Sequence, residues 1–389
     1  MTNYEALGVR RVINASARLT KLGGSLMPPE VLDAMREASG WYVDLFDLQR
    51  RVGRRLADLT QNEAVYVSTG ASAGLFLSTL ACMTGDDLHA IARLPDTTGL
   101  RNEVIVHRAQ RMPYDPALQL AGGRLVEIGN ALQTFDWELE AAFTGRTAAV
   151  FYVAGEHLNH GALPLSDVIR IAHAHSVPVI VDAAAQLPPV DNLWRFTRDL
   201  GADLVVFSGG KDLRGPQASG MIAGRADLIE ACYTHGAPHQ RFGRPMKVGK
   251  EEMMGLLAAV ERYLRLDHVA RQAGFEATVA AWIAALDGLP GVRASRAFPN
   301  EAGQPVPRVL VEIDPAVNGL TPGGVVQALW EGDPAIAVAG GHPHGFYLTP
   351  DCLEPSEEML VAERVRAVLR SAQTTMRIAV AAATPDRAS

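Results

Sequence analysis

The chain has 389 residues and a formal net charge of −7, and 48% of its residues are hydrophobic against 20% charged. This much apolar material can form a large core, which excludes intrinsic disorder as the main state. The acidic balance, without any basic run, disfavours a nucleic-acid partner. The N-terminus lacks the pattern of a signal peptide, no 18-residue apolar stretch follows, and the three cysteines fit neither a disulfide framework nor a metal site. We therefore expect a cytoplasmic protein without a membrane segment or a bound metal.

The length suggests about two domains. Residues 1–50 contain a loop rich in Gly and Pro and then a helix that begins near Pro29, and we expect this segment to pack with a small C-terminal domain. Residues 51–255 form the predicted large domain, in which Val- and Ile-rich runs alternate with helical patterns. Such near-continuous apolar runs are typical of strands buried on both faces of a mostly parallel sheet. The seven runs are residues 64–69, 103–107, 124–129, 148–153, 177–182, 203–208 and 219–224.

The last third of the chain has a different pattern. A long helical pattern covers residues 249–286 and carries the chain out of the large domain. Strand patterns at 307–313 and 335–340 and a helical pattern at 356–372 then predict a smaller α+β domain. We expect residues 256–389 to hold this linking helix and the small domain.

Lysine is rare in this chain. Only four of the 36 basic residues are lysines, namely Lys21, Lys211, Lys247 and Lys250. Mutational bias toward GC-rich codons would also produce this imbalance. Arginine cannot lose its proton and attack a carbonyl, whereas lysine can, so each remaining lysine is a candidate for chemistry.

Polar residues end three of the predicted strands. Asp182 follows five apolar residues, Lys211 follows the strand that ends at Ser208, and the small-residue turn 68–72 lies between a strand and an apolar helix. In open α/β sheets, ligands bind at the carboxyl ends of the strands. Each feature also has an ordinary explanation, because an acid after a strand is often a helix cap, and Gly-Gly-Lys is often a plain turn.

Together these residues fit pyridoxal 5′-phosphate. The aldehyde of this cofactor needs a lysine amine for a Schiff base, its pyridine nitrogen needs a carboxylate, and its phosphate suits a helix N-terminus. Lys211 and Asp182 are 29 residues apart, one strand–helix–strand unit, so both reach the same edge of the sheet. We expect the phosphate to bind at Thr69, Gly70, Ala71 and Ser72, with Ser208 adding a hydroxyl.

The segment FSGGKDLRGPQASGMIAGR, preceded by VPVIVDAAAQLPP and followed by GRPMKVGKEEMMGLLAAVERYL, resembles the selenocysteine synthase-like branch of fold-type-I pyridoxal-phosphate enzymes. The opening RRVINASARLTKLGGSLMPPEVLDAM is similar to the same branch, so the resemblance covers nearly the whole chain. Within the branch, the D-glucosaminate-6-phosphate ammonia-lyase group is the most similar. The resemblance implies an aminotransferase-like fold, with Lys211 as the Schiff-base lysine and Asp182 as the carboxylate at the ring nitrogen.

Two departures from this branch limit the resemblance. The selenium transferase has an extra N-terminal tRNA-binding region, whereas the sequence here begins directly with the catalytic-core motif. STGASAG also replaces its asparagine-rich phosphate loop, so we do not expect transfer of selenium to tRNA. The stretch VIVHRAQRMPYD also differs at the place where a residue would stack on the cofactor ring. His107 and Gln110 are the candidates there.

Several other residues are weaker candidates. Gln186 could hydrogen-bond the cofactor's phenolic oxygen or simply pack in its loop. Lys247 precedes a helix N-terminus, where cations oppose the helix dipole, and this favours an anion site for the cofactor phosphate, which in the resembling family lies nearby and could belong to the neighbouring subunit. Possible substrate contacts are Arg244, Arg214, His157 and His160. His342 and His344 read as a surface turn rather than a metal site.

By resemblance, we expect a pyridoxal-phosphate-dependent lyase. The favoured reaction is α,β-elimination, with release of ammonia, from a β-hydroxy or sugar-derived amino acid. A racemase, aldolase or aminotransferase would share the first half of this mechanism and remains an alternative. A binding protein that has lost turnover is an alternative of another class. The resemblance also implies a homodimer or higher homo-oligomer, in which the loop LGGSLMPP would cover the partner's cofactor.

Overall fold

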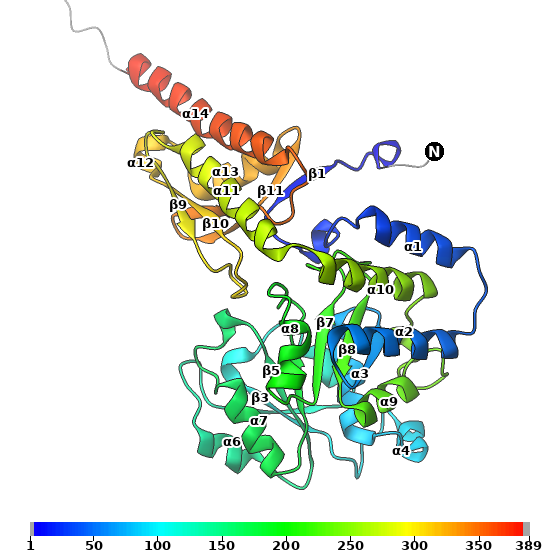
Figure 1. The fold of residues 1–389 in the computed structure, drawn as a ribbon. Coiled ribbons are helices and arrows are strands. Elements are labelled where there is room, and N and C mark those ends of the chain that lie inside the picture. The colour runs from blue at the N-terminus through cyan, green and yellow to red at the C-terminus, as the bar shows by residue number, and fades with distance from the viewer. Residues whose placement is uncertain (1–3, 384–389) are drawn as a thin grey trace, which may run out of the picture. The chain divides into compact units, whose positions relative to one another are not determined.

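The computed structural model describes residues 4–383, with side chains up to residue 370 (Figure 1). The chain divides into two compact units. The large unit comprises Gly24–Leu266 and Glu301–Gln304, and the small unit contains the chain up to Gly23, Asp267–Asn300 and the chain from Pro305 onward. The sequence predicted divisions near residues 50 and 255. Residues 1–3 and 384–389, at the outer ends of the predicted domains, lie outside the described part.

Seven strands form the sheet of the large unit, in the order β2–β8–β7–β6–β5–β3–β4. β8 is antiparallel to both of its neighbours, and the other pairs are parallel. Each strand coincides with one predicted apolar run to within two residues, so the predicted sheet is confirmed. The strands are β2 Ala64–Ser68, β3 Glu103–His107, β4 Arg124–Ile128, β5 Thr147–Val153, β6 Val179–Asp182, β7 Leu204–Ser208 and β8 Gly220–Gly224.

Helices cover both faces of this sheet (Figure 1). They are α1 Pro29–Ser39, α2 Leu45–Thr60, α3 Ala71–Thr84, α4 Leu88–Arg93, α5 Pro116–Leu120, α6 Asp136–Ala142, α7 Leu165–Ala174, α8 Asn192–Trp194, α9 Ala226–His235 and α10 Lys250–Arg265. A π-helical turn, Arg195–Asp199, follows α8, and short 3-10 turns lie at Glu156–Leu158 and Arg244–Met246.

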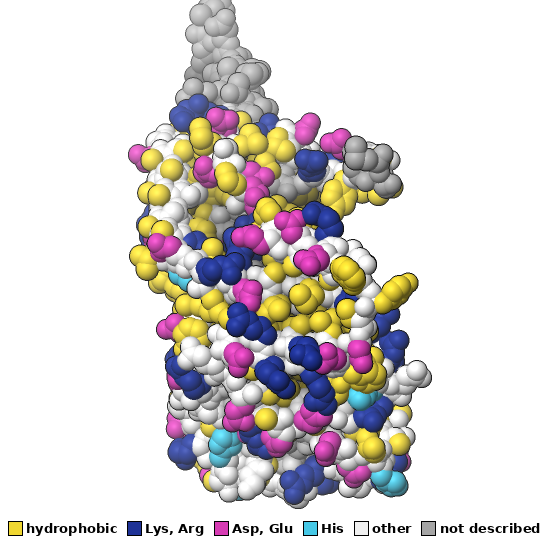
Figure 2. Space-filling model, turned by 45° about the vertical axis from the view of Figure 1, so that its right-hand side comes forward, with side chains coloured by type: hydrophobic (Ala, Val, Ile, Leu, Met, Phe, Trp, Pro, Cys, Tyr) yellow, Lys and Arg dark blue, Asp and Glu magenta, His cyan; other side chains and the backbone are white. Residues whose placement is uncertain are grey.

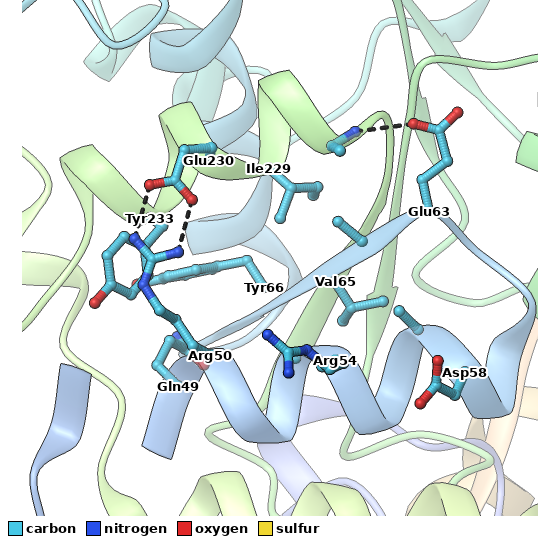
Figure 3. Close-up of a pocket in the computed structure, with 14 residues that line it drawn as sticks. Gln49, Arg50, Arg54, Asp58, Glu63, Val65, Tyr66, Ile229, Glu230 and Tyr233 are labelled. Carbon is cyan, nitrogen blue, oxygen red and sulfur yellow. Dashed lines mark hydrogen bonds and ion pairs between the residues drawn. The ribbon is translucent and has the colours of Figure 1, made fainter. Parts of the chain in front are cut away.

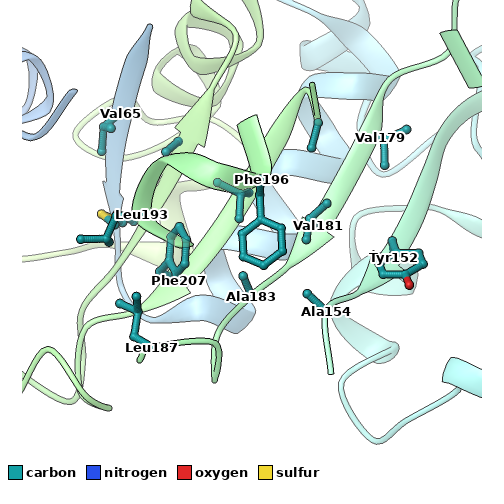
Figure 4. Packing of buried hydrophobic residues seen from close by; sticks show 14 of the residues in the cluster. Val65, Tyr152, Ala154, Val179, Val181, Ala183, Leu187, Leu193, Phe196 and Phe207 are labelled. Carbon is teal, nitrogen blue, oxygen red and sulfur yellow. The ribbon is translucent and has the colours of Figure 1, made fainter. Parts of the chain in front are cut away.

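Two apolar clusters form the core of the large unit, one on each face of the sheet. α3 is apolar on most sides because it is enclosed by the sheet, α5 and α9, and ten of its 14 residues are buried. On the opposite face, Val181 and Phe207 of the sheet pack with residues that include Leu193 and Phe196 (Figure 4). The strands are therefore apolar on both sides, which explains their continuous apolar runs.

The small unit contains a five-stranded sheet in the order β1–β11–β12–β10–β9. Its strands are β1 Val12–Ala15, β9 Val292–Ala297, β10 Arg308–Ile313, β11 Ala335–His342 and β12 Gly345–Leu348, and its helices are α11 His268–Leu286, α12 Pro315–Asn318, α13 Pro322–Glu331 and α14 Glu357–Ala383. The predicted strands β10 and β11 are confirmed. β1, β9 and β12 were not predicted because each is short or half-exposed.

The predicted helix 249–286 is in fact two helices, α10 and α11. The break lies at Leu266 and Asp267, where the backbone is extended. The side chain of Asp267 accepts a hydrogen bond of 2.8 Å from the amide of Ala270 and so caps α11. The prediction was wrong because the helical pattern hides this capping residue.

Candidate functional site

The candidate polar residues gather at one edge of the large sheet. Asp182 ends β6, Ser208 ends β7 and Ser68 ends β2, while Gly220 at the start of β8 pairs with both serines. Side chains alternate along a strand, so Asp182 lies on the same face as Ile180, which packs with α3. The structure therefore brings this carboxylate and the two serines to the face that α3 covers.

The turn between β2 and α3 leaves the N-terminus of α3 without a side-chain cap. Its N-cap residue is Gly70, whose φ of 93° favours glycine. A Cβ added at Gly220 would lie 2.8 Å from the carbonyl carbon of Gly70 and 3.0 Å from the amide nitrogen of Ala71. This close approach requires glycine at position 220. The first amides of α3, including those of Ala71 and Ser72, have no partner within the helix and can bind an anion.

The hydroxyl groups of Ser68 and Thr69 are already hydrogen-bonded. Ser68 Oγ donates to the carbonyl oxygen of Gly70 at 2.9 Å, and Thr69 Oγ1 donates to that of Ala218 at 3.3 Å. These two bonds hold the turn in place. Thr69 therefore supports the shape of the anion site in this structure.

Asp182 is a buried acid with 7% of its surface exposed. Its Oδ1 accepts a hydrogen bond of 2.9 Å from the amide of Ala184. Burial raises the pKa of Asp182, while the Ala184 amide and the positive charge of Lys211 lower it. A cation that contacts this carboxylate would stabilise its charged form.

Lys211 lies half-buried in a tight turn. Its carbonyl oxygen accepts hydrogen bonds from Ser25 Oγ at 2.6 Å and from the amide of Arg214 at 3.0 Å. A Cβ at Gly209 would meet Ser219 Oγ at 2.1 Å, so the chain can follow this path only with glycine there. Two hydrogen bonds thus fix the backbone of Lys211. The positive charge of its side chain lowers the pKa of Asp182.

The other candidate residues lie on loops and turns of the large unit. Gln186 is half-buried, and its Nε2 donates to the carbonyl oxygen of Ala302 at 3.1 Å. The guanidinium of Arg214 donates to the carbonyl oxygen of Leu26 at 2.6 Å. His157 and His160 are exposed on the loop after β5, and burial lowers the pKa of His157.

Two cations before α10 lie on the surface. Arg244 and Lys247 are exposed, and neither makes a side-chain hydrogen bond or ion pair with any described residue. Arg244 begins the short turn Arg244–Met246, and Lys247 follows it. Their side chains are available to an anion.

His107 and Gln110 were the candidates for stacking on the cofactor ring, and both side chains have other contacts in the structure. His107 is fully buried on the face opposite Asp182, and its ring lies edge-on to Tyr152 at 5.8 Å. Gln110 bonds both backbone groups of Val153 at 3.0 Å, which closes the end of β5. Both side chains are therefore engaged in packing or hydrogen bonding away from Asp182.

Sequence reasoning missed Ser25, Gly220 and Asp212. Ser25 and Gly220 act on the site through their contacts with Lys211 and with the α3 turn, which only the fold reveals. Asp212 follows Lys211 in the chain and is 2% exposed. Asp212 could have been found from the sequence, because it is an acid directly beside the candidate lysine.

The large unit has two cavities whose linings include neither Asp182 nor Lys211. One groove of about 270 Å³ runs between α2 and α9 beside β2 (Figure 3). Arg50 there donates to both carboxylate oxygens of Glu230 at 2.8 and 2.9 Å and lies 3.9 Å above the ring of Tyr233. A second cavity, of about 420 Å³, lies beside the loop after β5. Among residues 4–370, no group of three or more His, Cys, Asp or Glu side chains is arranged to hold a metal.

Comparison with known proteins finds relatives along nearly the whole chain. Residues 12–273 match the family described as L-seryl-tRNA selenium transferase. The chain is 36% identical over 375 residues to a 5′-C-glycyluridine monooxygenase-decarboxylase of a Streptomyces species, covering 94% of this chain and 92% of that protein. It is 34% identical over 376 residues to the D-glucosaminate-6-phosphate ammonia lyase of Salmonella typhimurium, covering 95% and 98%.

A solved structure supports the same relationship. The structure of D-glucosaminate-6-phosphate ammonia-lyase superimposes with a TM-score of 0.84 at 33% identity, covering 96% of this chain and 100% of that one. The predicted fold-type-I, aminotransferase-like fold is therefore confirmed. In the described part of the chain, no helix is long and apolar enough to cross a membrane.

Proposed function

The chain belongs to the L-seryl-tRNA selenium transferase family of pyridoxal-phosphate enzymes, and from that premise we propose that it is a pyridoxal-phosphate-dependent lyase. The proposed reaction is α,β-elimination from a β-hydroxy or sugar-derived amino acid, with release of ammonia. The observation that carries the proposal is the pair of Lys211 and buried Asp182 at the sheet edge where α3 begins without a cap.

The residues at this edge match what the cofactor requires. Burial raises the pKa of Asp182, and Lys211 is the cation whose charge lowers it. A protonated ring nitrogen would be a second cation and would further stabilise the charged carboxylate. The amides at the start of α3 have no side-chain cap, and a Cβ at Gly70 would meet nothing within 4 Å, so this turn leaves room for a phosphate near the backbone. We propose that Lys211 holds the aldehyde carbon covalently, with Ser208 adding a hydroxyl at the phosphate.

We propose the following roles in the reaction. When bound, the cofactor supplies an electron-withdrawing ring that accepts the electrons released at the substrate Cα. Asp182 keeps the ring nitrogen protonated through its carboxylate. When it is not bonded to the cofactor, Nζ of Lys211 would be placed to remove the substrate Cα proton as a general base. The tight turn around Lys211, fixed by Ser25, limits where that amine can move.

The relatives support more than one outcome of this first step. The ammonia lyase is 34% identical and the monooxygenase-decarboxylase 36% identical, so identity alone does not choose between their reactions. Elimination is favoured because the superposition on the ammonia-lyase structure covers all of that chain. Oxidative decarboxylation is the second candidate, and the same lysine and carboxylate would serve a racemase, aldolase or aminotransferase.

We also propose a homo-oligomer. Trp41 and Tyr42, in the connection between α1 and α2, are 69% and 106% exposed, which is unusual for large apolar side chains. Figure 2 shows basic and acidic side chains interspersed with hydrophobic patches on the displayed face. The stretch from 231 to 250 contains no acid, and its exposed Arg244 and Lys247 would serve a phosphate in a neighbouring subunit.

Borohydride reduction in the presence of excess cofactor, followed by peptide mapping, tests the cofactor site. We expect a reduced pyridoxyl group on Lys211, its loss in Lys211→Arg and its retention in Lys250→Arg, which changes a lysine that is paired with Glu251. A wild-type protein without a modified Lys211 would contradict the proposal and favour a binding protein without turnover.

Product analysis then tests the reaction. Elimination releases ammonia without an amino acceptor, so we expect ammonia and a 2-keto acid from hydroxy amino acids, with D-glucosaminate 6-phosphate included in the screen. Carbon dioxide release that needs oxygen would favour the second candidate. Inversion, aldehyde release or a requirement for a keto acid would indicate racemase, aldolase or aminotransferase activity.

A further inference from the structure

The connection between β9 and β10 contributes four residues to the large unit. Residues 298–307 join these two strands and form a longer loop than the usual hairpin loop of about two to five residues. The tip of the loop, Glu301–Gln304, is part of the large unit, although β9 and β10 belong to the small one. Ala302 and Gln304 of the tip are each 8% exposed. Ordering a long loop costs conformational entropy, which the contacts of the tip must offset.

The tip hydrogen-bonds the loop that follows Asp182. Nε2 of Gln304 donates to the carbonyl oxygen of Leu187, and the carbonyl oxygen of Ala302 accepts a hydrogen bond of 3.1 Å from Gln186 Nε2. Leu187 is 5% exposed and belongs to the apolar cluster of Figure 4. A buried backbone carbonyl needs a hydrogen-bond donor, which Gln304 supplies to Leu187. The tip is therefore bonded to this loop by two side chains, one from each side of the contact.

The tip also packs against the loop that follows β5. A Cβ added at Gly303 would lie 2.4 Å from Cβ of Glu156, and the φ of Gly303 is 77°, so this position requires glycine on both counts. Burial lowers the pKa of His157 in the same loop, and the negative charge of Glu301 acts in the opposite direction. β5 and β6 are neighbours in the sheet. The tip thus contacts the loops at two adjacent strand ends, and Asp182 is one of these ends.

The loop after β6 carries the amide that binds the carboxylate of Asp182. Burial raises the pKa of Asp182, and the hydrogen bond of 2.9 Å from the amide of Ala184 to its Oδ1 lowers that pKa. The loop is a tight turn, because the amide of Gln186 donates to the carbonyl oxygen of Ala183 at 3.0 Å. Ala184 lies within this turn, and the next residues, Gln186 and Leu187, are bonded to the tip. Loss of the tip would release the turn that holds the Ala184 amide in place.

We propose that the tip Glu301–Gln304 positions Asp182 by holding the loop 183–187 in place. Gln304 is a positioning residue: it binds the carbonyl oxygen of Leu187 and so keeps the Ala184 amide on the carboxylate of Asp182. The consequence for the cofactor rests on the proposed function, in which Asp182 binds the ring nitrogen. The order that the tip gives to the loop does not depend on that function and is measured separately.

Hydrogen exchange of the full chain without cofactor, read by mass spectrometry, tests the role of the tip. The variant is Gly303→Ala, and the control is Gly288→Ala, because Gly288 has a similar φ of 70° but nothing within 4 Å of an added Cβ. We expect the amides of residues 183–187 to exchange at least about tenfold faster in Gly303→Ala and within about twofold of the wild type in the control.

Gln304→Leu is a second variant, which removes the donor to Leu187 and should also speed this exchange. Circular dichroism shows whether each variant is folded, and Gln304→Leu decides the matter if Gly303→Ala does not fold. Exchange at the wild-type rate in the folded variants, or an equal increase in Gly288→Ala, would overturn the proposal.

Absorbance titration with pyridoxal phosphate at pH 6 and pH 8.5 tests the consequence for Asp182. We expect the affinity to fall about tenfold in Gly303→Ala and Gln304→Leu and less than about twofold in Gly288→Ala. The loss should be larger at pH 6, because the pKa of Asp182 rises further without the Ala184 amide and less of its carboxylate is then charged.

Faster exchange with unchanged affinity, or a larger loss of affinity at pH 8.5, would overturn the role of the tip in positioning Asp182. A wild-type protein that binds no cofactor would instead contradict the proposed function, and the exchange rates would still decide whether the tip holds the loop.

Discussion

Tyr263 Oη donates a hydrogen bond of 2.7 Å to Oδ2 of Asp212, the residue that follows Lys211. Tyr263 lies on α10 and is fully buried, and Asp212 is 2% exposed. A carboxylate in such a place needs hydrogen-bond donors to offset the loss of water. The turn that carries Lys211 is therefore tied to α10 by a buried polar contact.

Tyr263→Phe removes this donor without a large change in volume. We expect a loss of about 1–3 kcal/mol in the free energy of unfolding, because the acceptor is a buried carboxylate. Urea midpoints of the two proteins measure the loss. Tyr66→Phe is the matched control: Tyr66 is 1% exposed, and its hydroxyl donates to the neutral carbonyl oxygen of Ala237 at 3.3 Å. An equal or larger loss in the control would contradict this account.

Asp182→Asn should maintain or raise the stability of the apo protein but lower the turnover of the cofactor-loaded protein. The folded-state pKa of Asp182 is raised, so the native state holds its proton more tightly than the unfolded state, and stability falls as pH rises through this interval. Asparagine lacks this cost and keeps an oxygen for the Ala184 amide. We expect an equal or higher urea midpoint for the apo variant at pH 7.5, and turnover lowered at least about 100-fold. A destabilised apo variant would contradict the role of burial.

The sheet, and the positions of the candidate residues along its edge, could be predicted because both depend on local sequence. Continuous apolar runs reveal strands buried on both faces, and Asp182 and Lys211 directly follow two of them. The edge of the sheet then brings them together without any knowledge of packing. Such features are visible in one sequence.

Other features depend on contacts between distant segments and could not be predicted. Ser25 bonds the carbonyl oxygen of Lys211 across 186 positions of sequence. Gln110 looked available for a cofactor ring, but its amide closes the end of β5 at Val153. No pattern in a single sequence reveals which polar side chain hydrogen-bonds the backbone at the end of a strand.

His107 should make the protein sensitive to acid. It is fully buried, neither ring nitrogen has a hydrogen-bond partner, and burial lowers its pKa to about 4. Because the unfolded state takes up a proton near pH 6.5 and the native state does not, stability is full above about pH 6.5 and falls toward pH 4. The loss at pH 5 is about 2 kcal/mol from this residue.

His107→Leu tests this prediction. Urea midpoints at pH 7.5 and pH 5 should differ less in the variant than in the wild type, by about 2 kcal/mol in the free energy of unfolding. His235, whose pKa burial also lowers to about 4, should leave part of the acid sensitivity in place. If His107→Leu loses as much stability at pH 5 as the wild type does, His107 is not the source.

Two glycines in the middle of helices should respond to alanine with opposite signs. Gly53 of α2 packs on β2, and a Cβ there would lie 2.2 Å from the carbonyl oxygen of Val65, a backbone atom that cannot easily move. Gly274 of α11 has nothing within 4 Å of the same position. We expect Gly53→Ala to lower the free energy of unfolding by about 1–3 kcal/mol through overpacking, and Gly274→Ala to raise it by about 0.5–1 kcal/mol through helix propensity. Unfolding midpoints of the two variants decide the matter, and a neutral Gly53→Ala would show that α2 can move away from β2.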